Sequence, residues 1–222
     1  MDPKDTINTG KEIENLNLIK PNNKFINIKS DYFMRKLFGI MQTRISLKII
    51  KYNINIQKRM NININNYKDF FEKFSSIELE IIPIQNEYGP FINIKEEDKK
   101  YFHIYFNDNK KQEIKNTSLH TDDNVSKISI IIDYQIKSFS ELFYNCDCIE
   151  SIKFKKFYRN NVTDMSGMLS GCSSLKELNL NNFNTNNVTN MSGMLRGCSS
   201  LKELNLNNFN TNNVTKDRKS VV

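Results

Sequence analysis

Cysteine and histidine side chains are the ones that most often bind metals or carry out redox chemistry. Their number and spacing in this chain argue against a metal or redox centre. Cys146-Asp-Cys148 has one intervening residue, whereas the usual zinc and redox motifs have two. The chain holds only two histidines, His103 and His120, and both lie far from these cysteines in the sequence, so we do not expect a zinc site. Cys146, Cys172 and Cys198 instead recur every 26 residues, which predicts a row of buried thiols.

The carboxylates that lie close together in the sequence do not form a catalytic pair. Glu78 and Glu80 alternate with apolar residues, so we expect them on the solvent face of a strand, and we expect residues 96–98 in a loop. His103 is expected on one face of an edge strand. The chain has no phosphate-binding glycine loop, no Gly-x-Ser-x-Gly motif and no His-Glu-x-x-His motif. We therefore expect no catalytic residue, no metal and no cofactor, and a protein that is not an enzyme.

Composition and charge indicate which classes of molecule the protein binds and where in the cell it is located. The 222 residues carry a formal net charge of +7, spread along the chain without a long like-charge block. Its densest basic run, from Lys153 to Arg159, is interpreted as a solvated face, so we expect no specific nucleic-acid site. The amino terminus is polar, and no apolar run approaches the roughly 20 residues that span a bilayer. These features predict a cytoplasmic protein without a membrane span.

An internal repeat of 26 residues is the strongest pattern in the sequence. Residues 162–187 and 188–213 differ at only two positions, and residues 136–161 keep the apolar positions of the other two units. The pattern L-x-x-L-x-L predicts a short strand in each unit. Upstream apolar residues at steps of three and four predict a short helix, capped by Thr163 and ending near Gly171. Such a unit buries its apolar face only against a neighbouring unit.

The units resemble BspA-type leucine-rich repeats over residues 136–215. The resemblance rests on the segments V-T-x-M-S-x-M and C-x-S-L-x-x-L-x-L-x-x-F. It implies a solenoid of about three repeats, with Phe157, Phe183 and Phe209 as an aromatic spine, and it implies protein binding inside the cell or as a surface adhesion protein. No polar capping helix follows, and residues 216–222 read as a tail. The last repeat is therefore expected to fray, to self-associate or to belong to a longer array.

The first 135 residues divide by pattern into three segments. Residues 1–24 are polar and are expected to be disordered or extended, residues 25–74 predict short helices, and residues 75–135 predict strands that cap the repeats by continuing their sheet. Residues 25–62 weakly resemble an F-box, which implies contact with the linker subunit of a cullin ubiquitin ligase; a helical cap is the alternative. The residues that carry this resemblance are Phe33, Leu37, Phe38, Ile40, Leu47 and Ile50.

These segments together predict an α+β fold, in which short helices and a small cap sheet precede an α/β solenoid. We expect a non-enzymatic protein–protein interaction module. It binds other proteins through the strand face directed away from the core, and the sequence leaves the identity of these partners open. An F-box-like substrate adaptor and a BspA-like surface adhesion protein are the alternatives. The expected binding residues, three from each unit, are Ser151, Lys153, Lys155, Glu177, Asn179, Asn181, Glu203, Asn205 and Asn207.

Overall fold

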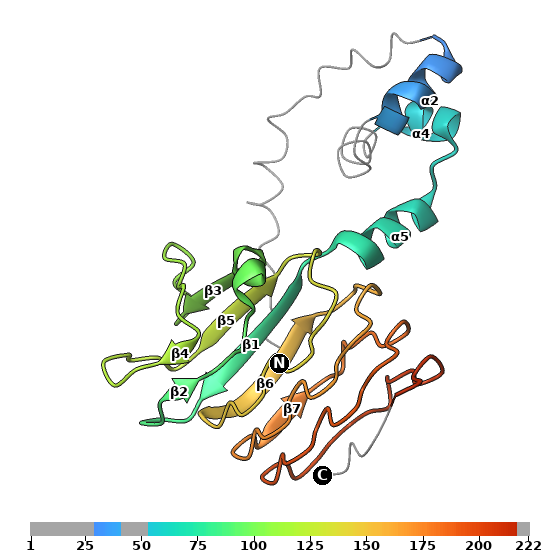
Figure 1. Ribbon diagram of the computed structural model, residues 1–222. Coiled ribbons are helices and arrows are strands. Elements are labelled where there is room, and N and C mark those ends of the chain that lie inside the picture. Colours follow the sequence, from blue (N-terminus) through green and yellow to red (C-terminus); the bar gives the residue numbers. More distant parts are fainter. Residues whose placement is uncertain (1–28, 41–52, 217–222) are drawn as a thin grey trace, which may run out of the picture. The chain divides into compact units, whose positions relative to one another are not determined.

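A computed structural model of the chain describes residues 29–40 and 53–216 (Figure 1). The chain divides into two compact units, residues 1–67 and residues 68–222. No helix among the described residues is long and apolar enough to cross a membrane.

Two short helices pack together in the first unit, α2 (Asp31–Ile40) and α4 (Ile54–Met60). The Asn53 side chain caps α4 by accepting a hydrogen bond from a backbone N–H of its first turn. An ion pair of 2.7 Å between Arg59 Nε and Asp31 Oδ1 joins the two helices. The contact is partly exposed, so it orients the helices more than it stabilises them.

A five-stranded mixed sheet organises the second unit. Its strand order is β3-β5-β1-β6-β7, and every neighbouring pair is antiparallel except β6 and β7, which are parallel. A smaller sheet pairs β2 with β4. A 3₁₀ helix, η2, occupies residues 96–101, where the sequence predicted a loop. The bounds in chain order are α5 (Ile64–Phe74), β1 (Ile77–Pro83), β2 (Gly89–Pro90), η2 (Glu96–Tyr101), β3 (Phe102–Phe106), β4 (Ser118–Leu119), β5 (Ile128–Ile132), β6 (Ile149–Lys156) and β7 (Glu177–Asn179).

The two faces of this sheet differ in burial. Alternate residues of β1 and β5 are buried, as the period of two residues along a strand requires. Leu79 is paired with Ile130, and Ile130 with Ile104, so these buried side chains form one apolar row across three strands. The residues between them lie on the opposite, open face.

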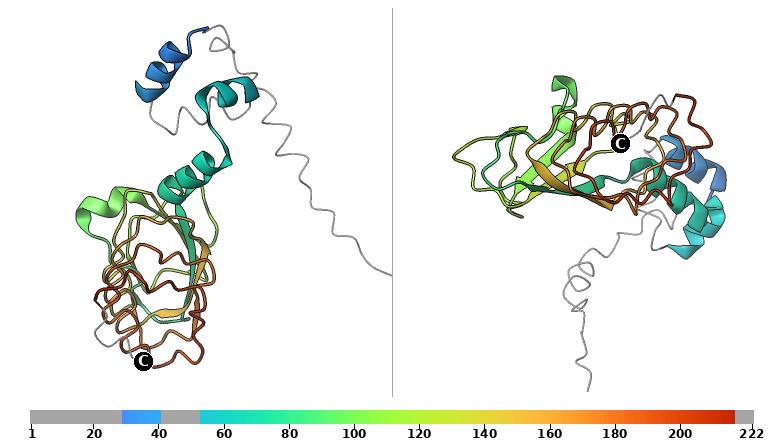
Figure 2. Two further views of the ribbon diagram at one scale, coloured as in Figure 1. Left: turned by 90° about the vertical axis from the view of Figure 1, so that its right-hand side faces the viewer. Right: turned by 90° about the horizontal axis from the view of Figure 1, so that it is seen from below.

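Residues 136–216 form successive 26-residue units that lie side by side. The Phe139 N–H donates to Asp164 O (2.7 Å), and the Met165 N–H donates to Asn190 O (2.9 Å), one repeat further on. Parallel bridges continue this register through Asn190 to Lys216. Seen end-on, the units run as flattened loops with the strand segment along one side (Figure 2).

The predicted solenoid of strand-and-helix units is wrong. No helix forms in residues 162–172, where the apolar spacing indicated one: Asp164 forms a β-bridge and residues 166–171 form turns. The physical reason lies in the backbone: the Leu169 N–H donates to Met194 O (2.9 Å) and the Gly171 N–H to Arg196 O (2.7 Å), so these groups bond the next unit rather than their own turn. Only the first two units contribute a strand to the sheet, as β6 and β7. The described fold is therefore mostly a mixed sheet with few short helices.

Phenylalanine side chains pack in a row through the repeat units. The rings of Phe157 and Phe183 stack with centroids 4.4 Å apart and an angle of 17° between their planes, and Phe183 stacks on Phe209 at 5.7 Å and 5°. Phe157 and Phe183 are buried, whereas Phe209 is half-buried. The repeated Phe thus supplies apolar contact between each unit and the next.

Candidate binding surface

Side chains on the open face of the sheet form a row across all five strands. The strand register pairs Tyr105 with Ser129, Ser129 with Glu80, Glu80 with Lys153, and Lys153 with Asn179. Residues directly opposite each other on neighbouring strands project to the same side of a sheet. The row therefore runs from β3 through to β7, and its first strands come from the segment that precedes the repeats.

Most of the predicted binding residues meet on this face. A hollow of about 760 Å³ lies over β6, β7 and the third repeat unit, and Glu80, Lys176 and Lys202 also border it. Lys155 and Asn207 are exposed but do not line the hollow. The predicted residues that do line it are Ser151, Lys153, Glu177, Asn179, Asn181, Glu203 and Asn205.

The third unit borders the hollow without forming a strand. Residues 201–206 have no strand pairing with β7. On either side of this segment, Ser199 Oγ donates to Ser173 O (3.4 Å) and Asn208 Nδ2 donates to Asn181 O (2.7 Å). Hydrogen bonds to the second unit therefore hold residues 201–206, which border the hollow beyond β7, at both ends of the segment.

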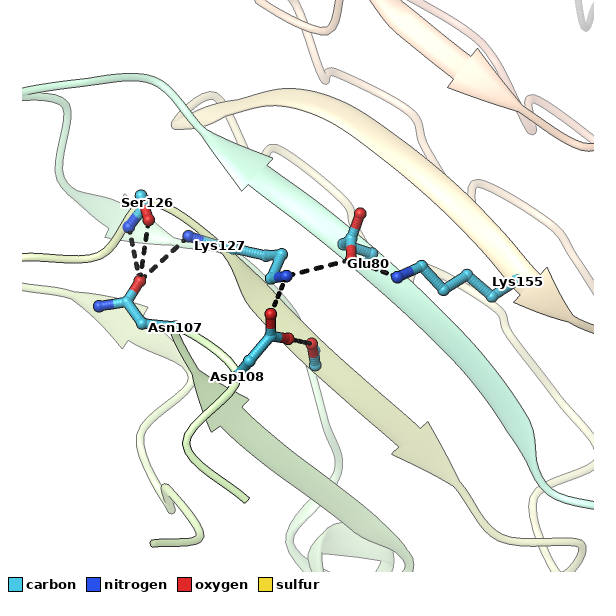
Figure 3. A network of polar contacts seen from close by, with 7 residues as sticks. Glu80, Asn107, Asp108, Ser126, Lys127 and Lys155 are labelled. Carbon is cyan, nitrogen blue, oxygen red and sulfur yellow. Dashed lines mark hydrogen bonds and ion pairs between the residues drawn. The ribbon is translucent and has the colours of Figure 1, made fainter. Parts of the chain in front are cut away.

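Charged side chains on the part of the open face near β1 and β5 form ion pairs with one another. Glu80 pairs with Lys155 at 2.5 Å and with Lys127 at 3.7 Å, and Lys127 also pairs with Asp108 (Figure 3). Asn107 Oδ1 accepts a hydrogen bond from the Lys127 backbone N–H at 3.3 Å. The hydrogen bond from Lys127 lowers the pKa of the Asp108 carboxyl, and the same bond raises the pKa of Lys127. This part of the face is a closed ion-pair network.

Some of the charged side chains over β6, β7 and the third unit are paired, and others are left without a partner. Lys176 pairs with Glu150 at 2.9 Å. In contrast, the side chains of Lys153, Glu177, Lys202 and Glu203 form no ion pair with any residue in the described part of the chain. The hollow therefore presents both signs of charge without internal partners, and an approaching molecule meets charges that it can pair with.

Asparagine amides add hydrogen-bond donors beside these charges. Asn179 Oδ1 accepts the Asn181 backbone N–H at 3.1 Å, and Asn205 Oδ1 accepts the Asn207 backbone N–H at 3.0 Å. Each of these local bonds occupies an amide oxygen and fixes the orientation of the side chain. The Nδ2 groups of Asn179 and Asn205 remain as donors toward the hollow.

The predicted row of thiols is present and buried. All four cysteines are free and buried. Cys172 Sγ donates to Phe143 O at 2.9 Å, and Cys198 Sγ donates to Leu169 O at 3.2 Å. Burial raises the pKa of Cys172 to about 12 and that of Cys198 to about 11. Thiols with such pKa values carry little thiolate at neutral pH and are weak nucleophiles.

His103 lies between two carboxylates that sequence reasoning did not connect with it. Its Nδ1 is 3.3 Å from Glu113 Oε1, and its Nε2 is 3.4 Å from Asp133 Oδ2. The histidine lies on edge strand β3, as predicted, and pairing of β3 with β5 brings Asp133 near it. Within the described residues, no group of three or more His, Cys, Asp or Glu side chains is arranged to hold a metal ion.

Residues predicted to contact a ligase linker lie partly outside the described chain. Leu47 and Ile50 fall in residues 41–52, and the side chains of Phe33 and Ile40 are likewise outside the described set. In α2, Phe38 is buried and Leu37 is half-buried.

Comparison with known proteins identifies one family model, described as a Mycoplasma protein of unknown function, DUF285, which matches residues 137–220. No curated protein and no solved structure matches the chain. The predicted resemblances to BspA-type leucine-rich repeats and to an F-box are wrong, because the repeats match DUF285 and neither other family is found. The adaptor and adhesion alternatives rested on those resemblances and lose their basis with them.

Proposed function

We propose that this chain is a non-enzymatic protein-binding module that uses the hollow on the open face of its sheet. The observation that carries the proposal is the set of free charges and amide donors gathered there from β6, β7 and the third unit. Complementary charge on a partner sets the orientation and rate of association.

The sheet beneath the hollow supports binding because it fixes the backbone positions of the residues on β6 and β7 before a partner arrives. Strand β6 is paired along its length with β1 and is also paired with β7. Ile152 and Phe154 anchor β6 in the core from the opposite face. A surface that is already ordered loses little conformational entropy on binding.

The chemistry of the hollow favours a polypeptide partner over a small apolar ligand. Small-molecule sites are mostly enclosed and lined by apolar side chains. Here the side chains exposed to the hollow are charged, amide and hydroxyl groups, because Ile152 is buried in the core and Leu178 packs against it. Such a polar surface resembles the rim of a protein–protein interface, where many weak polar contacts act together.

Site-specific photo-crosslinking tests the proposal. A photoreactive residue replaces Asn179, within the hollow, or Gln112, an exposed residue outside it. We expect protein adducts from position 179 in cells that express the chain, with the cross-linked protein identified by mass spectrometry and its binding reproduced with purified components. Equal labelling at the two positions, or adducts that do not bind when purified, would contradict the proposal.

A further inference from the structure

A second pocket, of about 680 Å³, lies in the carboxy-terminal unit away from the residues of the hollow. It forms where the end of α5, the loop after β5 and the loop after β6 meet the second repeat unit. The residues that matter for its chemistry are Lys73, Phe74, Tyr134, Lys137, Asn161 and Asn187.

Hydrogen bonds hold the walls of this pocket in place. Asn160 donates its backbone N–H to Glu72 O (2.7 Å) and its Nδ2 to Glu72 Oε2 (3.0 Å), which ties the end of α5 to the loop after β6. Asn161 Nδ2 donates to Tyr134 O (3.0 Å), and Asn187 Nδ2 donates to Asn160 O (2.7 Å). The pocket is therefore preformed.

The charged residues that line the pocket are both lysines. The ammonium groups of Lys73 and Lys137 form no ion pair with any described residue, and no Asp or Glu is among the described residues that line the pocket. Arg159, next to Asn160 in the chain, is fully buried, and its Nη1 donates to Asp133 O at 2.8 Å. Its Nε and Nη2 have no hydrogen-bond partner. An anion in the pocket would meet the two unpaired lysines directly, while the buried Arg159 and the Glu72 carboxylate, which is hydrogen-bonded to Asn160, lie outside the lining.

The remaining walls supply an aromatic surface. The rings of Phe74 and Tyr134 meet edge to face with centroids 5.2 Å apart and an angle of 72°. Both residues line the pocket, so their rings are available for contact with an apolar or aromatic part of a ligand.

We propose that this pocket binds a small organic anion that carries an aromatic ring, the chemistry of a nucleoside monophosphate. Lys73 and Lys137 pair with the phosphate as point charges. Phe74 and Tyr134 contact the ring.

Isothermal titration calorimetry of the full chain tests this site, with adenosine 5′-monophosphate, adenosine and inorganic phosphate as probes. We expect saturable binding of the monophosphate, and affinities about tenfold or more weaker for adenosine and for phosphate alone, because each lacks half of the contacts. The double variant Lys73→Gln/Lys137→Gln should weaken monophosphate binding by a similar factor.

The matched control is Lys110→Gln/Lys111→Gln, which removes two exposed positive charges from a loop outside the pocket. It should leave the affinity unchanged. Thermal unfolding of each variant shows whether it is folded, and Asn161 amide resonances in the unmodified chain give a second readout that should shift on titration. No saturable binding, equal losses in the two double variants, or phosphate alone binding as tightly as the monophosphate would each overturn the proposal.

Discussion

Glu80 and Lys153 are directly paired across the antiparallel contact between β1 and β6, yet Glu80 forms its ion pairs with Lys155 and Lys127. Lys153 is therefore exposed and has no acidic partner in the described structure. The side chain of Glu80, only 18% exposed, is held by two lysines from different elements. Glu80 therefore contributes to the stability of the sheet, whereas Lys153 remains available to pair with a binding partner.

Substitutions at these two positions should differ in their effect on stability. Glu80→Ala leaves Lys155 without its partner and should lower the free energy of unfolding by about 0.5–1 kcal/mol, since partly exposed pairs contribute little more. Lys153→Ala removes no ion pair and should stay within about 0.5 kcal/mol of the unchanged protein. Urea unfolding followed by circular dichroism measures both, and equal losses would show that Lys153 is a structural residue.

Replacing a repeat glycine tests whether residues 188–198 form turns or a helix. Gly193 has φ of +62°, and a Cβ added to it would meet only Arg196 Cβ, at 4.0 Å. Gly193→Ala should therefore destabilise the chain by about 1–2 kcal/mol, the cost of a left-handed conformation for a residue with a Cβ. The same change inside a helix would stabilise it by about 1 kcal/mol. Arg196→Ala, at an exposed position of the same segment, is the control and should be nearly neutral.

The row of stacked phenylalanines should carry much of the stability of the repeat units. Phe183 is 4% exposed and lies between Phe157 and Phe209. Phe183→Ala should cost about 3–5 kcal/mol, because it removes buried apolar surface and leaves a cavity. Phe209→Ala should cost less, since Phe209 is half-buried and contacts one neighbouring ring. Chemical denaturation compares the two, and a smaller loss for Phe183 would refute the packing described.

The buried thiols should make the chain less stable at alkaline pH. Burial raises the pKa of Cys172 from 9.0 to about 12 in the folded state, so the folded state keeps this proton where the unfolded state has lost it. The contribution of this thiol to the free energy of unfolding is therefore fully present below pH 9 and is lost as the pH rises from 9 toward 12. Denaturation midpoints between pH 7 and about pH 10.5 should fall less steeply in Cys172→Ala than in the unchanged chain. Parallel curves would exclude the thiol as a cause.

The alternation of apolar and polar residues along the sequence predicted the strands well, because successive side chains of a strand point to opposite faces of the sheet and one face is buried. Strands β1, β3 and β5 lie where alternating or β-branched runs predicted them, and β1 joins the repeat sheet through β6 as expected. The same alternation placed Glu177 and Asn179 on the open face.

The helix prediction failed because apolar spacings of three and four also arise from consecutive tight turns. Met165, Met168 and Cys172 are buried at such steps, while the backbone N–H groups at 167, 169 and 171 bond the next unit. Glycines four residues apart, at 167 and 171, are the signal that favoured turns. The position of Glu80 at the hollow could not be predicted, since it depends on pairing between strands distant in sequence.

If unpaired charges on the open face bind a protein partner, the affinity of a cross-linked partner should differ between two charge-reversed chains. Lys153→Glu reverses a free charge within the hollow, and Lys110→Glu reverses an exposed charge outside it. Biolayer interferometry at low and high salt should show that Lys153→Glu weakens binding by about tenfold or more and reduces its salt dependence, while Lys110→Glu leaves both unchanged. Equal affinities for the two variants and the unchanged chain would contradict the claim.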